Sequence, residues 1–144
     1  MASNGIEIGA HSVSHPFLSR ISKSSDLDFE IVGSKRRAEE QLNRRVKHFC
    51  YPTGSVEDVG PEAVDAVMRC GFLTGVCSEL GFVPAQANPY FLPRFAVDAT
   101  DPKLFFARTV SGYRAPRPRG ISASRAAVER MEPVQMARSG AKAD

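Results

Sequence analysis

The first half of the chain alternates short apolar runs with one longer amphipathic stretch. Gly5–Ala10 predicts a strand with both of its isoleucines on one face, and this strand ends where His11 begins. From Ser25 onward a helix is predicted, because charged side chains surround an apolar stripe at near-helical spacing, made of Leu27, Ile31, Ala38 and Leu42. Val46–Tyr51 then predicts a second buried strand, which a Pro-Thr-Gly turn closes.

The second half continues the alternation. Pro61 begins a predicted helix that Gly71 ends, Phe72–Cys77 predicts a third strand, and Phe91–Val97 a further extended piece. A last helix is predicted over 101–112. Strands alternating with helices imply parallel strands and right-handed crossovers, so the predicted class is α/β. About 110 such residues supply too few units to close a barrel alone, which leaves a partial (β/α) barrel or a small open sheet with an exposed edge.

The composition is that of an ordinary globular protein, with 144 residues, 42% hydrophobic and 24% charged. No run approaches the roughly 20 apolar residues that a membrane span needs, and the first residues do not resemble a signal peptide. The sequence as written therefore predicts a soluble, cytoplasmic chain, although a missing N-terminus could have carried a signal. The three cysteines form no CxxC or Cys/His cluster, so we expect small buried hydrophobes rather than disulfides or structural zinc.

The net charge of +3 by itself favours a nucleic-acid-binding protein, but the distribution of the charges along the chain does not. Residues 1–112 carry 12 Lys and Arg against 13 Asp and Glu, whereas residues 113–144 carry 7 against 3. The basicity belongs to this tail, which has no Phe, Trp or Leu and predicts a mostly disordered segment. The division is therefore a domain over 1–112 and a tail over 113–144. A solvated terminus and a basic arm that contacts phosphates both remain open, but nucleic acid is not the favoured partner.

Two histidines carry the clearest chemical signal. His11 and His15 lie in the string GAHSVSHP and share one face if the turn after the first strand is helical. Imidazole suits zinc and similar metals. Both histidines follow the carboxyl end of a predicted parallel strand, where α/β folds build their sites. The alternative is an incidental pair of surface or capping histidines.

The order of several motifs resembles one family. GAHSVSHP is followed by a charged amphipathic helix, FCYPTG, a second helix, RCGF, and the run Asn88 to Arg94. This order is similar to the polysaccharide deacetylase family, the chitooligosaccharide deacetylase homology domain of carbohydrate esterase family 4. HSxxHP corresponds to the family's second motif and FCYPTG stands in the place of its third. The resemblance covers roughly residues 5–112 and implies that the partial barrel is of the polysaccharide deacetylase type.

The resemblance implies a hydrolase that removes N-acetyl, or in some members O-acetyl, groups from carbohydrate, an acetylated amino-sugar oligomer or polysaccharide being the partner. In the family, one aspartate and two histidines hold a divalent metal, usually zinc, whose bound water attacks the acetyl carbonyl while a carboxylate acts as base. His11 and His15 match the two histidines. Ser12 is expected to fix their loop through backbone hydrogen bonds. Tyr51 and Arg94 are candidate substrate-binding residues; a packed tyrosine and a surface arginine are the alternatives.

The chain departs from the family pattern in one important respect. The first motif, a strand that ends in adjacent aspartates, has no counterpart before His11, and Glu7 lies too near on the same strand to replace it. We therefore expect a truncated, inactive chain with an incomplete metal site, no identified catalytic residue and apolar faces that favour self-association. A noncatalytic remnant or carbohydrate-binding fragment is the main alternative, and an unrelated basic-tailed interaction module another. Were the chain active, a carboxylate from Glu7, Asp98 or Asp101 would have to complete the site.

Overall fold

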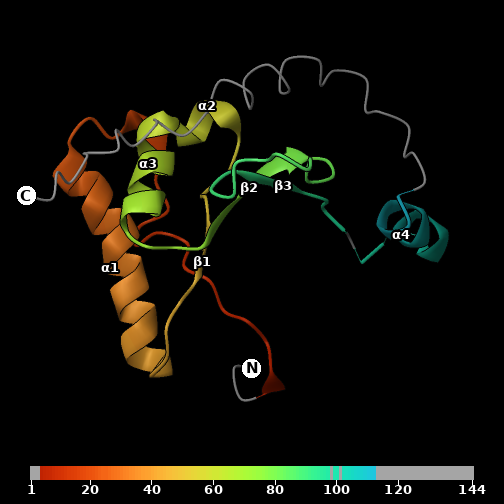
Figure 1. The fold of residues 1–144 in the computed structure, drawn as a ribbon, viewed down its shortest axis with the longest axis horizontal. Helices are drawn as coiled ribbons and strands as arrows, with labels where there is room; N and C mark the ends of the chain where they lie inside the picture. The colour runs from red at the N-terminus through yellow and green to blue at the C-terminus, as the bar shows by residue number, and fades with distance from the viewer. Residues whose placement is uncertain (1–3, 98, 101, 113–144) are drawn as a thin grey trace, which may run out of the picture.

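The structure is a computed structural model that describes residues 4–97, 99–100 and 102–112. The order of its elements confirms the predicted α/β class (Figure 1). The elements are η2 (Leu18–Arg20), α1 (Ser24–Leu42), β1 (His48–Cys50), α2 (Val56–Val59), α3 (Pro61–Arg69), β2 (Thr74–Leu80), β3 (Leu92–Arg94) and α4 (Lys103–Val110). The predictions for Asp98, Asp101 and the tail 113–144 lie outside the described residues.

The three strands form a parallel sheet in the order β1-β2-β3. The segment before His11 adds to the free side of β1 through a single parallel bridge between Ala10 and Phe49. Ala10 donates to the His48 carbonyl at 2.9 Å, and the Cys50 N–H donates to the Ala10 carbonyl at 2.9 Å. All of these segments run in one direction, so their carboxyl ends meet at the same edge of the sheet.

The predicted first strand is therefore wrong over most of its length. Within 5–10 only Ala10 pairs with the sheet, and Ile6 is 51% exposed. The Ile6 carbonyl accepts from the Arg44 guanidinium at 3.1 Å rather than from a neighbouring strand. Alternation alone cannot form a strand where no layer covers the apolar face and no neighbour completes the hydrogen bonds.

The other strands are found where they are predicted, with shifted ends. β1 begins later than Val46, because the N–H of that buried valine donates to Glu39 on α1 at 2.9 Å. β2 begins at Thr74 and runs on to Leu80, past the predicted end. β3 is shorter than the predicted Phe91–Val97, and Pro93 within it lacks an N–H donor.

The predicted helices are confirmed, and two short ones are added, the α-helix α2 and the 3₁₀ helix η2. α1 and α3 match their predicted ranges closely, and α4 ends just before Gly112. α2 begins after its N-cap Ser55, whose hydroxyl accepts from the Asp58 N–H at 3.2 Å. Among the described residues, no helix is both long and apolar enough to cross a membrane.

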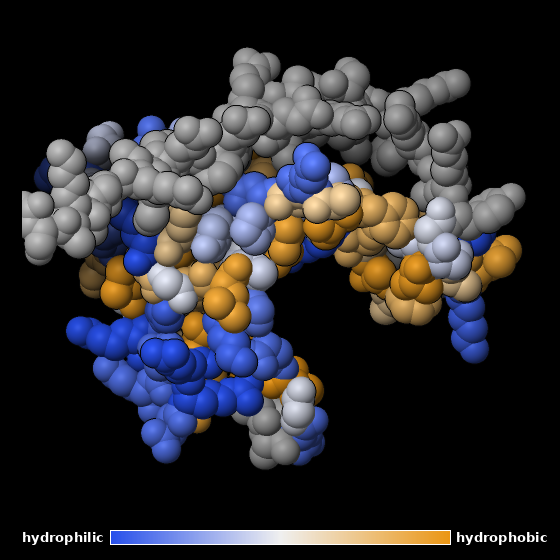
Figure 2. Space-filling model, in the orientation of Figure 1, coloured by the Kyte–Doolittle hydropathy of each residue, from blue (hydrophilic) through white to orange (hydrophobic). Residues whose placement is uncertain are grey.

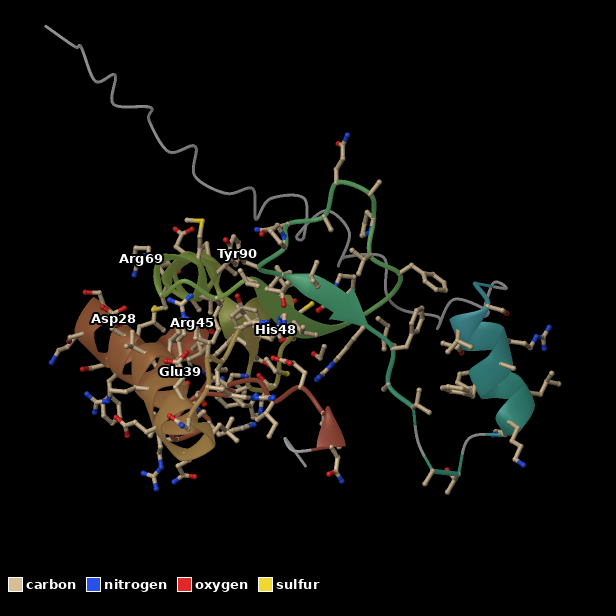
Figure 3. The ribbon with its side chains drawn as sticks, turned by 60° about the horizontal axis from the view of Figure 1, so that its bottom comes forward. Asp28, Glu39, Arg45, His48, Arg69 and Tyr90 are labelled. Atoms are coloured by element: carbon tan, nitrogen blue, oxygen red, sulfur yellow. The ribbon has the colours of Figure 1, made fainter. Side chains whose placement is uncertain are left out.

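The core lies between the sheet and the pair α1 and α3, which run side by side on one side of it (Figure 1). Its largest buried side chains are aromatic: Phe49 packs against Tyr51 and Phe72, with ring centroids 5.3 and 5.4 Å apart. At the surface Asp28 of α1 and Arg69 of α3 form an ion pair at 3.7 Å (Figure 3). This packing fixes the sheet edge that carries the candidate site.

Candidate metal centre

His11 begins the site at the carboxyl edge of the sheet, directly after the bridge at Ala10. Its Nδ1 lies 2.7 Å from the backbone oxygen of Cys50, at the end of β1. A carbonyl oxygen only accepts, so a neutral His11 donates from Nδ1 and keeps the lone pair on Nε2. Metal-ligating histidines are commonly oriented by such a bond from their second nitrogen, so Nε2 of the exposed His11 is available to a metal ion.

His15 reaches the same place through a tight bend rather than a helical turn. Ser12 and His15 both have left-handed backbone conformations, with φ of 59° and 60°. The Ser12 hydroxyl accepts from the His15 N–H at 3.0 Å, which confirms the expected role of this serine in fixing the loop. A helical turn over these residues, the condition under which the sequence placed both histidines on one face, is therefore not formed.

The bend nevertheless brings the two imidazoles together. Their ring centroids lie 4.9 Å apart, with the planes at 71°. Both side chains are exposed. The loop thus presents two nitrogen donors side by side to solvent at the sheet edge.

Glu30, on the buried face of α1, is a residue that sequence reasoning missed. Its carboxylate accepts from the N–H groups of Val13 and Ser14 at 2.8 and 2.9 Å and from the Ser14 hydroxyl at 2.6 Å. Burial by itself raises the pKa of Glu30, but the hydrogen bonds from Ser14 and Val13 outweigh it, so that the pKa is lowered overall. Glu30 therefore stays charged beneath the loop. The sequence signal that could have identified Glu30 is its position three residues after Leu27, which places a carboxylate on the apolar stripe of the helix.

Arg94 ends β3 at the same edge as the histidines. One of its guanidinium nitrogens lies 3.3 Å from the Cys50 sulfur, and the backbone oxygen of Cys50 is the partner of His11. Cys50 thus connects the arginine to the histidine side of the site. The Arg94 side chain is exposed to solvent.

Tyr51 follows β1, but it faces the core. Its side chain is fully buried and its hydroxyl donates to the Tyr90 carbonyl at 2.6 Å. Burial raises its pKa well above the ordinary value, which keeps the hydroxyl protonated. This geometry favours the packed alternative over a direct contact with substrate.

No third protein ligand accompanies the histidines in the part of the chain that the structure describes, where no group of three His, Cys, Asp or Glu side chains could hold a metal ion. The Glu7 carboxylate is 3.8 Å from Arg44 in an ion pair. The structure therefore gives Glu7 an alternative partner. The two other carboxylates that could complete the site, Asp98 and Asp101, are not among the described residues.

His48 and Cys77 have contacts or burial that serve the fold. His48, at the start of β1, has its Nδ1 2.8 Å from the Thr74 hydroxyl, as expected for a structural histidine. Cys77 is buried as predicted, and burial raises the pKa of its thiol to about 11. Cys50 and Cys70 are only half-buried, and all three are free thiols.

Comparison with known proteins identifies the family of this chain. The sequence model of the polysaccharide deacetylase family matches residues 1–72, half of the chain. The chain therefore belongs to the polysaccharide deacetylase family. No curated protein sequence matches it.

Solved structures show the same fold. The deacetylase PplD of Streptococcus pyogenes, in complex with acetate, is similar over 70% of this chain, with 22% identity and a TM-score of 0.64. A polysaccharide deacetylase from Bacillus cereus is similar over 76%, with 19% identity and a TM-score of 0.66. The chain covers 43% and 34% of these two proteins, so it spans less than half the length of either.

Proposed function

We propose that this chain carries the two-histidine half of a metal centre for deacetylation of carbohydrate. The observation that carries the proposal is the pair His11 and His15, whose rings lie 4.9 Å apart at the carboxyl edge of a parallel sheet. Membership of the polysaccharide deacetylase family supports the reaction class, the hydrolysis of N-acetyl or O-acetyl groups. The proposed substrate is an acetylated amino-sugar oligomer or polysaccharide.

The residues present fit a divalent metal, zinc by resemblance, as part of a ligand set. His11 is oriented by the Cys50 carbonyl and offers Nε2, and His15 lies beside it. A catalytic zinc ion takes three protein ligands and an open position, and the described residues supply two. When bound, the metal would activate water and polarise an acetyl carbonyl near neutral pH. In this proposal Arg94 orients substrate from β3, while Tyr51 only packs.

This ligand set has a consequence for activity. Two imidazoles hold zinc weakly, and the described residues join no carboxylate to them as a third metal ligand. We therefore propose that the 144-residue chain alone binds metal weakly and does not release acetate. The same observation favours one second candidate, a noncatalytic fragment that binds carbohydrate at this edge.

Zinc titration by calorimetry tests the site, with the third histidine of the chain as the matched control. We expect weak binding by the wild type, a loss of binding of tenfold or more in His11→Ala and His15→Ala, and wild-type binding in His48→Ala, because His48 contacts Thr74 instead. Equal binding by all four proteins would show that the metal lies elsewhere.

Acetate release from acetylated chitooligosaccharides, with zinc or cobalt added, tests the reaction. No turnover is expected from this chain. If it turns over substrate and His15→Ala abolishes the turnover, a carboxylate of this chain completes the site and the proposal of an incomplete centre is wrong. Binding of the same oligosaccharides without turnover would favour the second candidate.

A further inference from the structure

We propose that Glu30 is the positioning residue of the candidate metal centre: from α1, its carboxylate holds the loop that carries both histidines in the shape that brings their rings together. The consequence for metal binding rests on the proposed function. The consequence for the loop itself does not, and this difference allows the two to be tested separately.

The three hydrogen bonds to Glu30 all fall between the two histidines. Oε2 accepts from both backbone N–H groups, of Val13 and Ser14, and Oε1 accepts from the Ser14 hydroxyl. Glu30 is only 6% exposed. A buried carboxylate is costly unless it is hydrogen-bonded, and bonds to a charged acceptor are stronger than neutral ones. The carboxylate and the loop therefore stabilise each other.

The loop needs such support because its backbone is unusual. Ser12 and His15 both have positive φ without being glycine, a conformation that non-glycine residues seldom adopt. Conformations of this kind persist where the surroundings impose them, and they cluster at functional sites. Here the surroundings are the Ser12 hydroxyl within the loop and Glu30 beneath it.

A second contact from the same helix supports the loop. A Cβ placed on Gly33 of α1 would lie 3.3 Å from a methyl carbon of Val13, so the valine side chain packs directly over this glycine. Glu30 and Gly33 are one turn apart on α1, and both contact Val13 of the loop. The apolar contact holds the loop against the helix, and the carboxylate fixes its backbone direction.

Glu39, labelled in Figure 3, provides the matched control for this proposal. It lies on the same helix, and its carboxylate also accepts from a backbone N–H, that of Val46, at 2.9 Å. Its partner precedes β1 at the opposite end from the histidines. Removing this carboxylate is expected to destabilise the fold to a similar degree without reaching the histidine loop.

The test compares Glu30→Ala, Glu30→Gln and Glu39→Ala in the full chain. Nuclear Overhauser contacts between the two imidazoles and the ¹⁵N shifts of His11, which report the Nδ1–H tautomer, are measured without metal. We expect Glu30→Ala to lose the ring contacts and Glu39→Ala to keep them. Glu30→Gln is expected to rescue them in part, because an amide oxygen can accept both N–H groups and its NH₂ can donate to Ser14.

Zinc calorimetry on the same variants gives the second readout. Affinity should fall about tenfold in Glu30→Ala and stay near the wild-type value in Glu39→Ala. Ring contacts that survive in Glu30→Ala would overturn the positioning role. If the wild type binds no zinc but Glu30→Ala still loses the ring contacts, the positioning role of Glu30 is supported. The proposed function is then contradicted instead.

Ser14→Ala keeps the test decisive if Glu30→Ala does not fold. Ser14 is exposed, and this change removes one donor to Glu30 while leaving α1 intact. A partial loss of the ring contacts in Ser14→Ala supports the proposal, and ring contacts identical to those of the wild type in both Ser14→Ala and Glu30→Gln contradict it.

Discussion

His11 and Tyr51 each direct a side-chain hydrogen bond to a backbone carbonyl, but their burial gives them opposite roles. His11 is exposed and has a second nitrogen to offer once Nδ1 is bound to Cys50. Tyr51 is fully buried, and its single polar atom is already bonded to Tyr90. A group can serve both structure and ligand only if it has a further polar atom that reaches solvent. By this criterion His11 is able to bind a ligand while Cys50 orients it, whereas Tyr51 contributes only to the packing of the core.

Glu30 predicts how stability depends on pH. Its folded pKa lies below the ordinary value of about 4.5, so the carboxylate contributes stability above that pH and loses it as the pH falls through the folded pKa. Glu30→Ala should therefore lower the free energy of unfolding by on the order of 2 kcal/mol at pH 7. The difference between wild type and variant should shrink well below pH 4.5. Urea denaturation at pH 7 and pH 3.5 measures both.

Glu40→Ala serves as the control for this pH series, because its carboxylate is an exposed partner of Arg36. It should differ little from the wild type at either pH. A Glu30→Ala deficit that stays constant from pH 7 to pH 3.5 would show that the carboxylate charge is not the source of its stabilisation.

The sequence could reveal His11 and His15 but not the residue beneath them. Two histidines four apart after a strand are visible as a motif, whatever backbone joins them. Glu30 is one of several acidic residues on a long charged helix, and only its place on the apolar stripe distinguishes it. That it meets Val13 and Ser14 depends on how α1 packs against the loop, which no local pattern encodes.

At the scale of elements, β2 depends on one glycine where two other segments converge. Gly75 is buried in the strand and its N–H donates to the Pro89 carbonyl at 3.0 Å. A Cβ there would overlap the Tyr90 carbonyl oxygen and lie 2.8 Å from the Tyr51 hydroxyl. The absence of a side chain at Gly75 thus makes room for the bond between the two tyrosines.

Gly75→Ala should therefore destabilise the protein strongly. The methyl group forces apart the Tyr51–Tyr90 contact and the segment before β3, a cost of about 3 kcal/mol by comparison with other overpacked cores. Gly81→Ala is the matched control, because a Cβ at Gly81 would meet nothing within 4 Å. Chemical denaturation should show a much lower midpoint for the first variant and little change for the second. Equal midpoints would contradict this account of β2.

The helices could be predicted because their own residues carry the whole sequence signal. The exact ends of the strands could not, because they depend on pairing with a neighbouring strand. α1 and α3 carry an apolar stripe or a proline start, and their ranges were close. The strands shifted, because a strand ends where its neighbour stops pairing rather than where apolar residues stop. The first predicted strand shows this most clearly, since it reaches the sheet only at Ala10.

At the scale of the whole molecule, several apolar side chains remain exposed to solvent. They gather over α4, which stands apart from α1 and α3 across the sheet (Figures 1 and 2). Phe106 and Val110, one turn apart on α4, are 47% and 62% exposed, and Phe82 before β3 is 55% exposed. Exposed apolar groups that lie together favour association. The sheet edge at β3 is a poorer candidate, because Pro93 cannot donate to an added strand.

We therefore expect the purified chain to self-associate, and to do so through α4. Sedimentation velocity over a range of concentrations should show the wild type shifting from monomer to larger species. The double variant Phe106→Glu/Val110→Glu should stay monomeric, because charge on this surface opposes its burial. Val32→Glu, at a 44% exposed site on α1, should associate as the wild type does. A wild type that is monomeric at every concentration would contradict self-association through α4. Equal association of the double variant and Val32→Glu would place the contact on another surface.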